Sequence, residues 1–379
     1  TFNLDMSYFK YHRGFRMTNN KFHKLFGAEP RPQESALSQF HMDIAASIQE
    51  VTEEIIIKLA KTLRKETGLK NLCMAGGVAL NCVANGRLLK EKIFEKIWVQ
   101  PASGDAGSSL GGALLAWYEY LNKTRIVNPN DSMKGSYLGC SYSNQEVKEY
   151  LLGINASFIE LEDEKLFKQI AILLDQGKVI GWFDGAMEFG PRALGSRSII
   201  GDPRNTTMQS VMNMKIKYRE SFRPFAPSIL EEDIASHFEL NETSPYMLFV
   251  ASIKKNLRKK LKPSDENLFG IEKLNTIRSS LPAITHVDYS ARVQTVNHET
   301  NPRYYQLIKA FKEKTGCPTI VNTSFNVRGE PIVRTPQDAY RCFMRTEMDI
   351  LVLQNQVLVK EEQPKIMNDE NWKQTFKLD

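Results

Sequence analysis

One repeated pattern constrains the fold of this chain most strongly. A short strand-like stretch leads through a glycine-containing loop into a helix. Residues 71–75 form such a stretch and lead through a Gly-Gly pair into a predicted helix at 81–92. The pattern repeats at once, with a strand at 96–99, a loop at 101–105 and a helix at 108–121. Strand, loop and helix in this order are typical of crossover units. We therefore expect an α/β fold.

The flanking sequence predicts how the chain is divided. Apolar residues recur every three or four positions from Ile44 to Leu63, which indicates an amphipathic helix, and Gly68 supplies a stop. A cluster of turn-forming residues follows the crossover units at 128–131. We place the domain boundary there and predict one domain over 1–130 and a second over 131–379.

The second predicted domain alternates strands and helices again. We expect a glycine-rich loop over 184–203 and strands that include 283–286 and 318–322. Helices are predicted at 302–315 and 335–346, and a closing hairpin around Asn355. These elements again indicate an α/β domain.

Composition and cysteine usage exclude several classes of protein. The 379 residues are 42% hydrophobic and 25% charged, which is ordinary for a soluble globular chain. No apolar run approaches the roughly 20 residues that span a bilayer, so we expect no membrane partner. The five cysteines form no CxxC pair, which argues against a disulfide framework or a structural zinc site. A reducing compartment fits best, and we expect the cytoplasm.

The net charge of +6 has a local origin, because the run 254–262 (KKNLRKKLK) alone holds six basic residues. Such a run is more often a solvated loop than an arm that binds nucleic acid, although that second interpretation stays open.

Basic residues gather in two segments of the second domain. The stretch 181–204 places Arg192 and Arg197 among five glycines, and guanidinium groups on such a loop suit phosphate. Lys217, Arg219 and Arg223 then crowd a few residues further on. On an extended segment, Lys217 and Arg219 would point to one face and grip one anion. An exposed basic loop is the alternative.

Polar residues at predicted strand ends suggest further site residues. Ser324 and Asn326 follow the apolar stretch 318–322, where they could contact a ligand or simply form a turn that caps the strand. His286 could act as a general base with Asp288 as its orienter and Arg292 as an anion contact. A lone histidine there is more often only a satisfied polar group.

The first domain carries two weaker signals. Gly76 and Gly77 would let a ligand approach the backbone before the helix that begins near Asn81, or they form only a tight turn. Asp105 could meet a metal ion or cap the following helix. The cationic motifs together predict an anionic small ligand, most simply a phosphate compound with a nucleotide.

Six of these motifs occur in one order: GGVALN, SGDAGSSLGGAL, FGPRALGSRSI, KYRESFRPFAPS, THVDYSARVQTV and NTSFNVRGEPIV. In this order the chain resembles the O-carbamoyltransferases of the nodulation NodU, cephamycin and tobramycin type. The resemblance implies an actin-like (ASKHA) lobe followed by a YrdC-like domain with a twisted mixed sheet. It also implies an enzyme that uses carbamoyl phosphate, ATP and Mg²⁺ to form carbamoyl-adenylate and carbamoylates a hydroxyl of a small-molecule acceptor.

The resemblance also implies roles for individual residues. Lys217, Arg219, His286 and Arg223 would be catalytic. Carbamoyl phosphate and nucleotide would be bound by the residues Arg192, Arg197, Ser324, Asn326, Arg292, Gly76, Gly77 and Asn81. Asp105 would be a ligand of Fe²⁺ or another divalent metal. A nucleotide- or RNA-binding module without full transfer activity is the alternative, although we expect no nucleic-acid partner.

The chain departs from the family pattern in its histidines, because no two of its six lie four residues apart. An HxxxH-type pair would complete the metal site. The chain therefore resembles the C-terminal two-thirds of such an enzyme, and we expect the first lobe to be absent. A truncated protein and a natural split protein with a partner lobe both fit this expectation.

Overall fold

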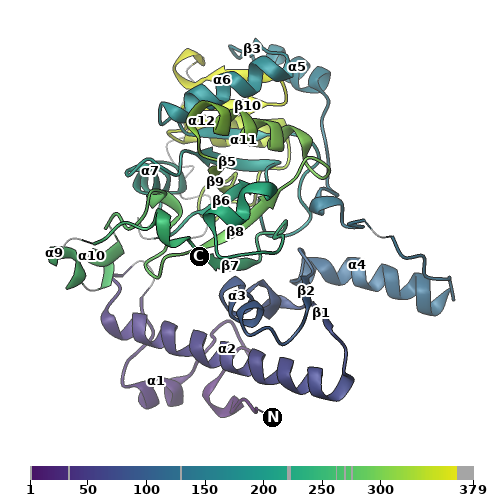
Figure 1. Cartoon of the computed structure of the whole chain (residues 1–379), viewed down its shortest axis with the longest axis vertical. Helices are drawn as coiled ribbons and strands as arrows, with labels where there is room; N and C mark the ends of the chain where they lie inside the picture. The colour runs from purple at the N-terminus through teal and green to yellow at the C-terminus, as the bar shows by residue number, and fades with distance from the viewer. Residues whose placement is uncertain are drawn as a thin grey trace. The chain divides into compact units, whose positions relative to one another are not determined.

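The computed structural model describes residues 2–32, 35–128, 130–219, 223–261, 263–268, 270–274 and 276–364. The chain forms two compact units, residues 1–68 and 69–379 (Figure 1). The predicted domain boundary at residue 130 therefore lies inside the second unit.

The first unit is helical. It contains η1 (Met6–Tyr8), α1 (Asn20–Phe26) and α2 (Gln39–Thr67). The long amphipathic helix was predicted from its apolar periodicity, and the structure confirms it as α2. Gly68 ends α2 in the left-handed conformation, with φ of 67° and its backbone N–H donating to Arg64 O.

The second unit opens with the predicted crossover pattern. Strands β1 (Asn71–Met74) and β2 (Lys96–Val99) pair in parallel, as the alternation of strand and helix predicted. Between and after them lie η2 (Gly77–Leu80), α3 (Cys82–Lys90), α4 (Asp105–Leu115) and the π-helical segment η3 (Ala116–Tyr120). Gly86 lets α3 approach the main sheet closely, because a Cβ there would lie 2.4 Å from Val250 O.

A nine-stranded mixed sheet forms the body of the second unit, in the order β3-β11-β10-β4-β5-β9-β6-β8-β7. Its strands are β3 (Ile159–Glu160), β4 (Ile180–Phe183), β5 (Arg197–Gly201), β6 (Ala226–Leu230), β7 (Phe249–Ser252), β8 (Ser290–Val296), β9 (Thr319–Ser324), β10 (Ile350–Leu353) and β11 (Gln356–Val359). Every residue of β4, β5, β6 and β10 is buried, so these strands form the core of the sheet.

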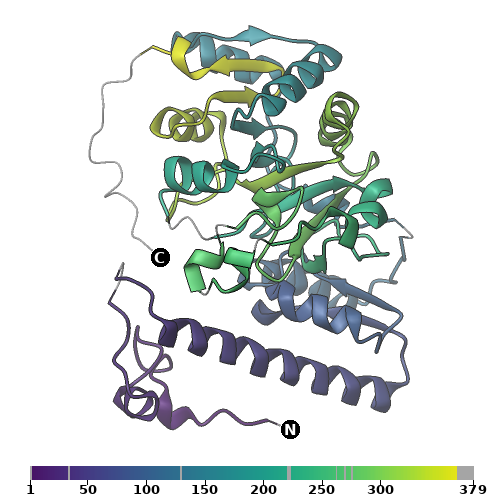
Figure 2. The ribbon, with the colours of Figure 1, turned by 60° about the vertical axis from the view of Figure 1, so that its left-hand side comes forward.

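Helices cover both faces of the sheet, and Figure 2 shows α11 and α12 on opposite sides of it. α6 packs along α11, whereas α12 packs on α5, β4 and β10. The helical segments are η4 (Lys134–Ser136), α5 (Asn144–Gly153), α6 (Asp163–Asp175), α7 (Met208–Val211), η5 (Met212–Lys217), η6 (Glu231–Asp233), α8 (Ile234–His237), η7 (Lys255–Leu257), α9 (Pro263–Glu266), α10 (Gly270–Leu274), η8 (Pro282–Ile284), α11 (Pro302–Thr315), α12 (Pro336–Arg345) and η9 (Lys360–Glu362).

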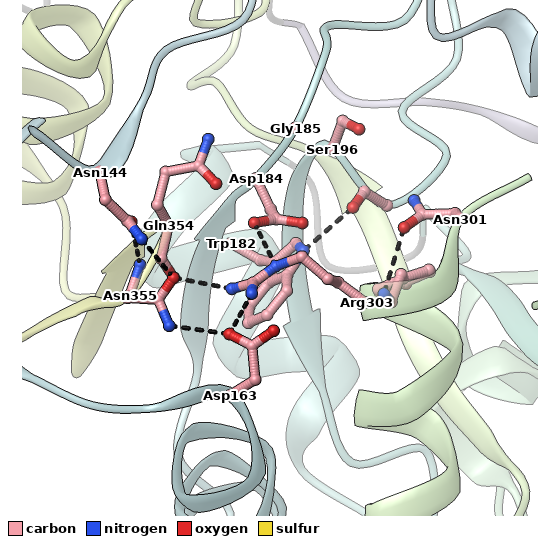
Figure 3. A network of polar contacts seen from close by, with 12 residues as sticks. Asn144, Asp163, Trp182, Asp184, Gly185, Ser196, Asn301, Arg303, Gln354 and Asn355 are labelled. Atoms are coloured by element: carbon pink, nitrogen blue, oxygen red, sulfur yellow. Dashed lines mark hydrogen bonds and ion pairs between the residues drawn. The ribbon is translucent and has the colours of Figure 1, made fainter. Parts of the chain in front are cut away.

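A polar network, from the buried Asp184 to the exposed Asp163, ties these layers together around Arg303 of α11 (Figure 3). Its Nε donates to Asp184 Oδ1 over 2.9 Å, and its Nη1 forms an ion pair with Asp163 at the start of α6. Asn355 donates to the same Asp163 over 2.8 Å from the turn between β10 and β11. One guanidinium group thus joins two helices and two strand ends.

Two sequence predictions about elements were wrong. Residues 282–284 form the 3₁₀ turn η8 in place of the predicted strand at 283–286, and Pro282 at the first helical position suits that turn. The predicted loop over 184–203 contains the central strand β5.

Candidate functional site

The sheet topology brings four separate motifs to one edge. β9 runs antiparallel to both β5 and β6, and β8 runs parallel to β6. The starts of β5, β6 and β8 therefore lie at the same edge as the end of β9. The segments that precede those three starts carry Arg192, Lys217, Arg219, Arg223 and His286. The end of β9 carries the polar cluster that begins at Asn322.

The glycine-rich loop before β5 is organised by Glu188. Its buried Oε1 accepts backbone N–H bonds from Leu194 (2.7 Å), Ser196 (2.8 Å) and Arg197 (3.3 Å). Three donors on one carboxylate oxygen hold the loop in shape. Glu188 is therefore an anchor of this loop, and sequence reasoning did not identify that role.

Lys217 contacts Ser324 and Asn326, two of the residues that the resemblance assigned to ligand binding. Its Nζ donates to Ser324 O, to Asn326 O over 2.8 Å and to Asn326 Oδ1 over 2.7 Å. Burial, with a smaller contribution from the Arg219 charge, lowers the pKa of Lys217 to about 7. The ammonium group is thus held at the end of β9 by neutral oxygen acceptors.

The local backbone at this lysine is not extended, so that part of the prediction was wrong. Lys217 ends the π-helical segment η5, and Tyr218 then adopts the left-handed conformation with φ of 50°. Arg219 Nε donates to Asn213 Oδ1 over 2.8 Å. Residues 220–222 of the predicted basic segment lie outside the described residues.

Two adjoining cavities lie at this edge of the sheet. The larger has a volume of about 510 Å³, and Arg192, Arg219, Arg223, His286, Arg292, Asn322 and Ser324 are among the residues that line it. The smaller has a volume of about 360 Å³, and Lys217, Asn326 and Glu330 are among those that line it. Arg219, Arg223 and Ser324 line both cavities.

The larger cavity is strongly cationic. Four arginines line it, and the described residues that line it include no aspartate or glutamate. Burial, together with the neighbouring Arg192 charge, lowers the pKa of Arg292 to about 10. Cations that gather in a partly enclosed space favour an anionic ligand, because the anion relieves their mutual repulsion.

His286 lies in the same cavity with a neutral imidazole. Burial lowers the pKa of His286 to about 4, and the nearby arginines Arg292 and Arg278 act in the same direction. Its Nδ1 lies 3.1 Å from Ser290 Oγ, which in turn donates to Asp288 Oδ1 over 2.6 Å. Ser290 therefore stands between the predicted base and its predicted orienter, and sequence reasoning missed this serine.

Arg197 lies away from both cavities, which contradicts its predicted contact with phosphate. It is completely buried, and its guanidinium lies 3.6 Å from the centre of the Phe183 ring. Its N–H groups donate to the backbone carbonyls of Asp184, Gly185, Ser196 and Cys140. These acceptors stabilise a charge inside the core, so the role of Arg197 is structural.

The glycine loop of the first motif does not itself line the cavities, although the helix that follows it does. Gly76 has a φ of 94°, and Gly77 begins η2. Asn81 caps α3, because its side chain accepts the Ala84 N–H over 3.1 Å. None of these three residues lines either cavity, whereas Cys82 and Val83, at the start of α3, line the larger one. Sequence reasoning did not single out those two residues.

Asp105 is exposed and is the first residue of α4, whereas Gly104 occupies the N-cap position, so the predicted cap is not formed by Asp105. Its carboxylate lies in the first turn, where it suits the helix dipole. Among the described residues, no group of three or more His, Cys, Asp or Glu side chains could hold a metal ion. The described residues therefore do not complete the metal site that the resemblance implied.

The family models match most of the sequence. The model described as "Carbamoyltransferase C-terminus" matches residues 171–360, and "Carbamoyltransferase N-terminus" matches residues 1–114. The chain belongs to the carbamoyltransferase family. Since both models match, our expectation that this carbamoyltransferase chain corresponds only to the C-terminal two-thirds was slightly wrong.

Curated relatives show how much of a longer protein the chain covers. An uncharacterized protein of Synechocystis sp. is 61% identical over the whole chain, which covers 62% of that protein. Nodulation protein NolO of Bradyrhizobium diazoefficiens is 40% identical over 83% of the chain and 54% of its own length. Nodulation protein NolNO of Sinorhizobium fredii is 39% identical over 89% of the chain and 46% of its own length. The chain thus spans about half the length of such relatives.

One solved structure also matches part of the carbamoyltransferase chain. Full-length HypF in the phosphate- and nucleotide-bound form covers 52% of the chain, and the chain covers 22% of it, at 18% identity and a TM-score of 0.33. A TM-score this low does not establish a shared fold. None of the described helices is both long and apolar enough to cross a membrane.

Proposed function

We propose that the two adjoining cavities bind carbamoyl phosphate and ATP, form carbamoyl-adenylate, and supply the carbamoyl group to a hydroxyl of a small-molecule acceptor. The observation that carries this proposal is the position of Lys217. Its ammonium group is held by Ser324 and Asn326, and Ser324 lines both cavities. A cation at this junction can contact an anion that passes from one bound ligand to the other.

The proposed reaction has three balanced steps. Water first converts carbamoyl phosphate into carbamate and inorganic phosphate. A carbamate oxygen then attacks the α-phosphorus of ATP, and the bond to the β-phosphate breaks to release pyrophosphate. Finally, the acceptor oxygen attacks the carbamoyl carbon, AMP leaves, and the hydroxyl proton goes to solvent. Mg²⁺ would accompany ATP as a counter-cation.

The cationic lining would supply most of the catalysis in the first two steps. Negative charge develops on phosphate oxygens in both, and Arg192, Arg219, Arg223 and Arg292 line the cavity where those oxygens would lie. His286 is neutral near pH 7, so it can accept a proton from the attacking water. The actin-like nature of the first domain and the YrdC-like nature of the second are part of this proposal.

Phosphorus NMR on the full chain with carbamoyl phosphate, ATP and Mg²⁺, without acceptor, tests the proposal. We expect the protein to release phosphate and pyrophosphate beyond spontaneous decay, and Lys217→Ala to lose that excess. Lys215→Ala is the matched control, because Lys215 carries the same charge two residues away and pairs with Glu347 outside both cavities. We expect this control to react like the unmodified protein.

Two other outcomes would contradict the proposal. If Lys217→Ala turned over as fast as the unmodified protein, Lys217 would have no role in the reaction. No turnover by any of the three proteins, together with RNA binding that weakens steeply with salt, would instead favour the nucleotide- or RNA-binding alternative.

A further inference from the structure

Asn322 of β9 lines the larger cavity, and one of its buried acceptor atoms finds no partner among the residues that the structure describes. The residue is completely buried, and its Nδ2 donates to Ala193 O (3.1 Å), Ser228 Oγ (3.0 Å) and Gln294 Oε1 (2.8 Å). Its Oδ1 is buried and makes no hydrogen bond with the described residues. Buried side-chain acceptors are nearly always satisfied, so an exception next to a cavity points to a ligand.

The orientation of this amide follows from its neighbours. Ala193 O is a backbone carbonyl and can only accept. Gln294 Nε2 donates to Leu194 O over 2.7 Å, which leaves Gln294 Oε1 facing Asn322. Turning the Asn322 amide over would bring its oxygen against both acceptors. Two backbone carbonyls thus establish that Oδ1 is the atom without a partner.

The position of Asn322 along β9 relates this acceptor to the anion-binding groups. Asn322 and Ser324 are two residues apart, so they share one face of the strand and lie roughly 6.7 Å apart along it. Both line the larger cavity, and Ser324 contacts the Lys217 ammonium. A small ligand whose anionic end lies at Ser324 and Lys217 can extend an N–H donor toward Asn322.

We propose that Asn322 Oδ1 accepts a hydrogen bond from the carbamoyl NH₂ group and so selects a carbamoyl donor over acyl phosphates that lack this group. This inference rests on the proposed function, because it takes carbamoyl phosphate as the ligand of the larger cavity. It names the atom that distinguishes an amino group from a methyl group of similar size.

The test compares two ligands that differ at that group. Carbamoyl phosphate and acetyl phosphate are titrated into the full chain and into Asn322→Leu by calorimetry, with inorganic phosphate as the probe of the anion site. We expect the unmodified protein to prefer carbamoyl phosphate by roughly tenfold, the worth of one hydrogen bond to an otherwise unsatisfied group. We expect Asn322→Leu to bind both ligands about equally and to retain its phosphate affinity.

Ser228→Ala is the matched control, because it removes one partner of the same amide and leaves Oδ1 in place. This variant should keep the preference for carbamoyl phosphate. If Asn322→Leu does not fold, Asn322→Val provides the same comparison, because valine also lacks an acceptor oxygen. An unmodified protein that binds the two ligands equally well overturns the inference without any variant.

The outcomes separate this inference from the proposed function. A preference for carbamoyl phosphate that survives in the folded Asn322 variant overturns the inference and leaves the proposed function intact. Binding of neither ligand by the unmodified protein, or equal binding by Lys217→Ala, overturns the proposed function itself.

Discussion

The neutral imidazole of His286 makes a measurable prediction about the pH dependence of stability. Burial lowers the pKa of His286 from 6.5 to about 4 in the folded protein, whereas the unfolded chain has the ordinary value. Between these values the unfolded state binds more protons than the folded state. The contribution of the neutral His286 to the free energy of unfolding is therefore fully present above pH 6.5, and it is lost as the pH falls toward 4.

The expected magnitude follows from the same two values. The difference corresponds to about 3.4 kcal/mol in total, at 1.36 kcal/mol for each tenfold change in proton affinity. At pH 5 about 2 kcal/mol of it should already be lost. We would measure urea unfolding at pH 7.5 and pH 5 for the unmodified protein, His286→Gln, and His298→Gln as a control at an exposed histidine.

We expect His286→Gln to lose about 2 kcal/mol less than the unmodified protein between the two pH values, and His298→Gln to behave like the unmodified protein. An identical loss in His286→Gln would refute the reasoning. So would an NMR titration that places the midpoint of His286 near 6.5, because the folded and unfolded states would then bind protons equally and the pH dependence would vanish.

Two further predictions concern the framework of the site. Arg303→Met should lower the free energy of unfolding by about 3–5 kcal/mol, because it leaves the buried Asp184 carboxylate without its cation, whereas Lys178→Met breaks an exposed pair and should cost under about 1 kcal/mol. Equal losses in denaturant titrations would contradict this. Gly86→Ala should destabilise by about 1–3 kcal/mol and weaken phosphate binding, because the new Cβ meets the backbone of β7, whereas Gly153→Ala meets nothing within 4 Å. Unchanged phosphate affinity in Gly86→Ala would show that the position of α3 does not affect phosphate binding.

The elements with a clear apolar period were predictable from the sequence, and the central strand β5 was not. Residues 318–322 and the hairpin around Asn355 alternate or run apolar in the expected way, and the structure confirms them as strands. β5 begins with Arg197 and Ser198, which are polar in sequence but completely buried. Backbone carbonyls from distant segments satisfy this arginine, and local sequence patterns do not reveal such partners.

The sequence predicted which charged residues belong to the motifs of the candidate site, but not which of their side chains line the cavities. Arg192 and Arg197 belong to one motif and looked equivalent, yet only Arg192 lines a cavity. The difference arises because Arg197 lies on a strand covered on both faces, while Arg192 lies on the preceding loop. Asn322 belongs to the polar cluster at the end of the predicted strand, but the sequence assigned it no role. Only its neighbours in the fold determine which of its atoms lacks a partner among the described residues.

The larger cavity needs a framework that holds its arginines in place without relying on attraction among the charges that line it. Four arginines that converge without a carboxylate among the described lining residues repel one another when no anion is bound. The structure anchors the backbone around this cavity. The Glu188 carboxylate accepts backbone N–H groups of the glycine loop, and the neutral amides of Asn322 and Gln294 pair with each other. These neutral or remote groups therefore help to maintain the geometry of the cavity.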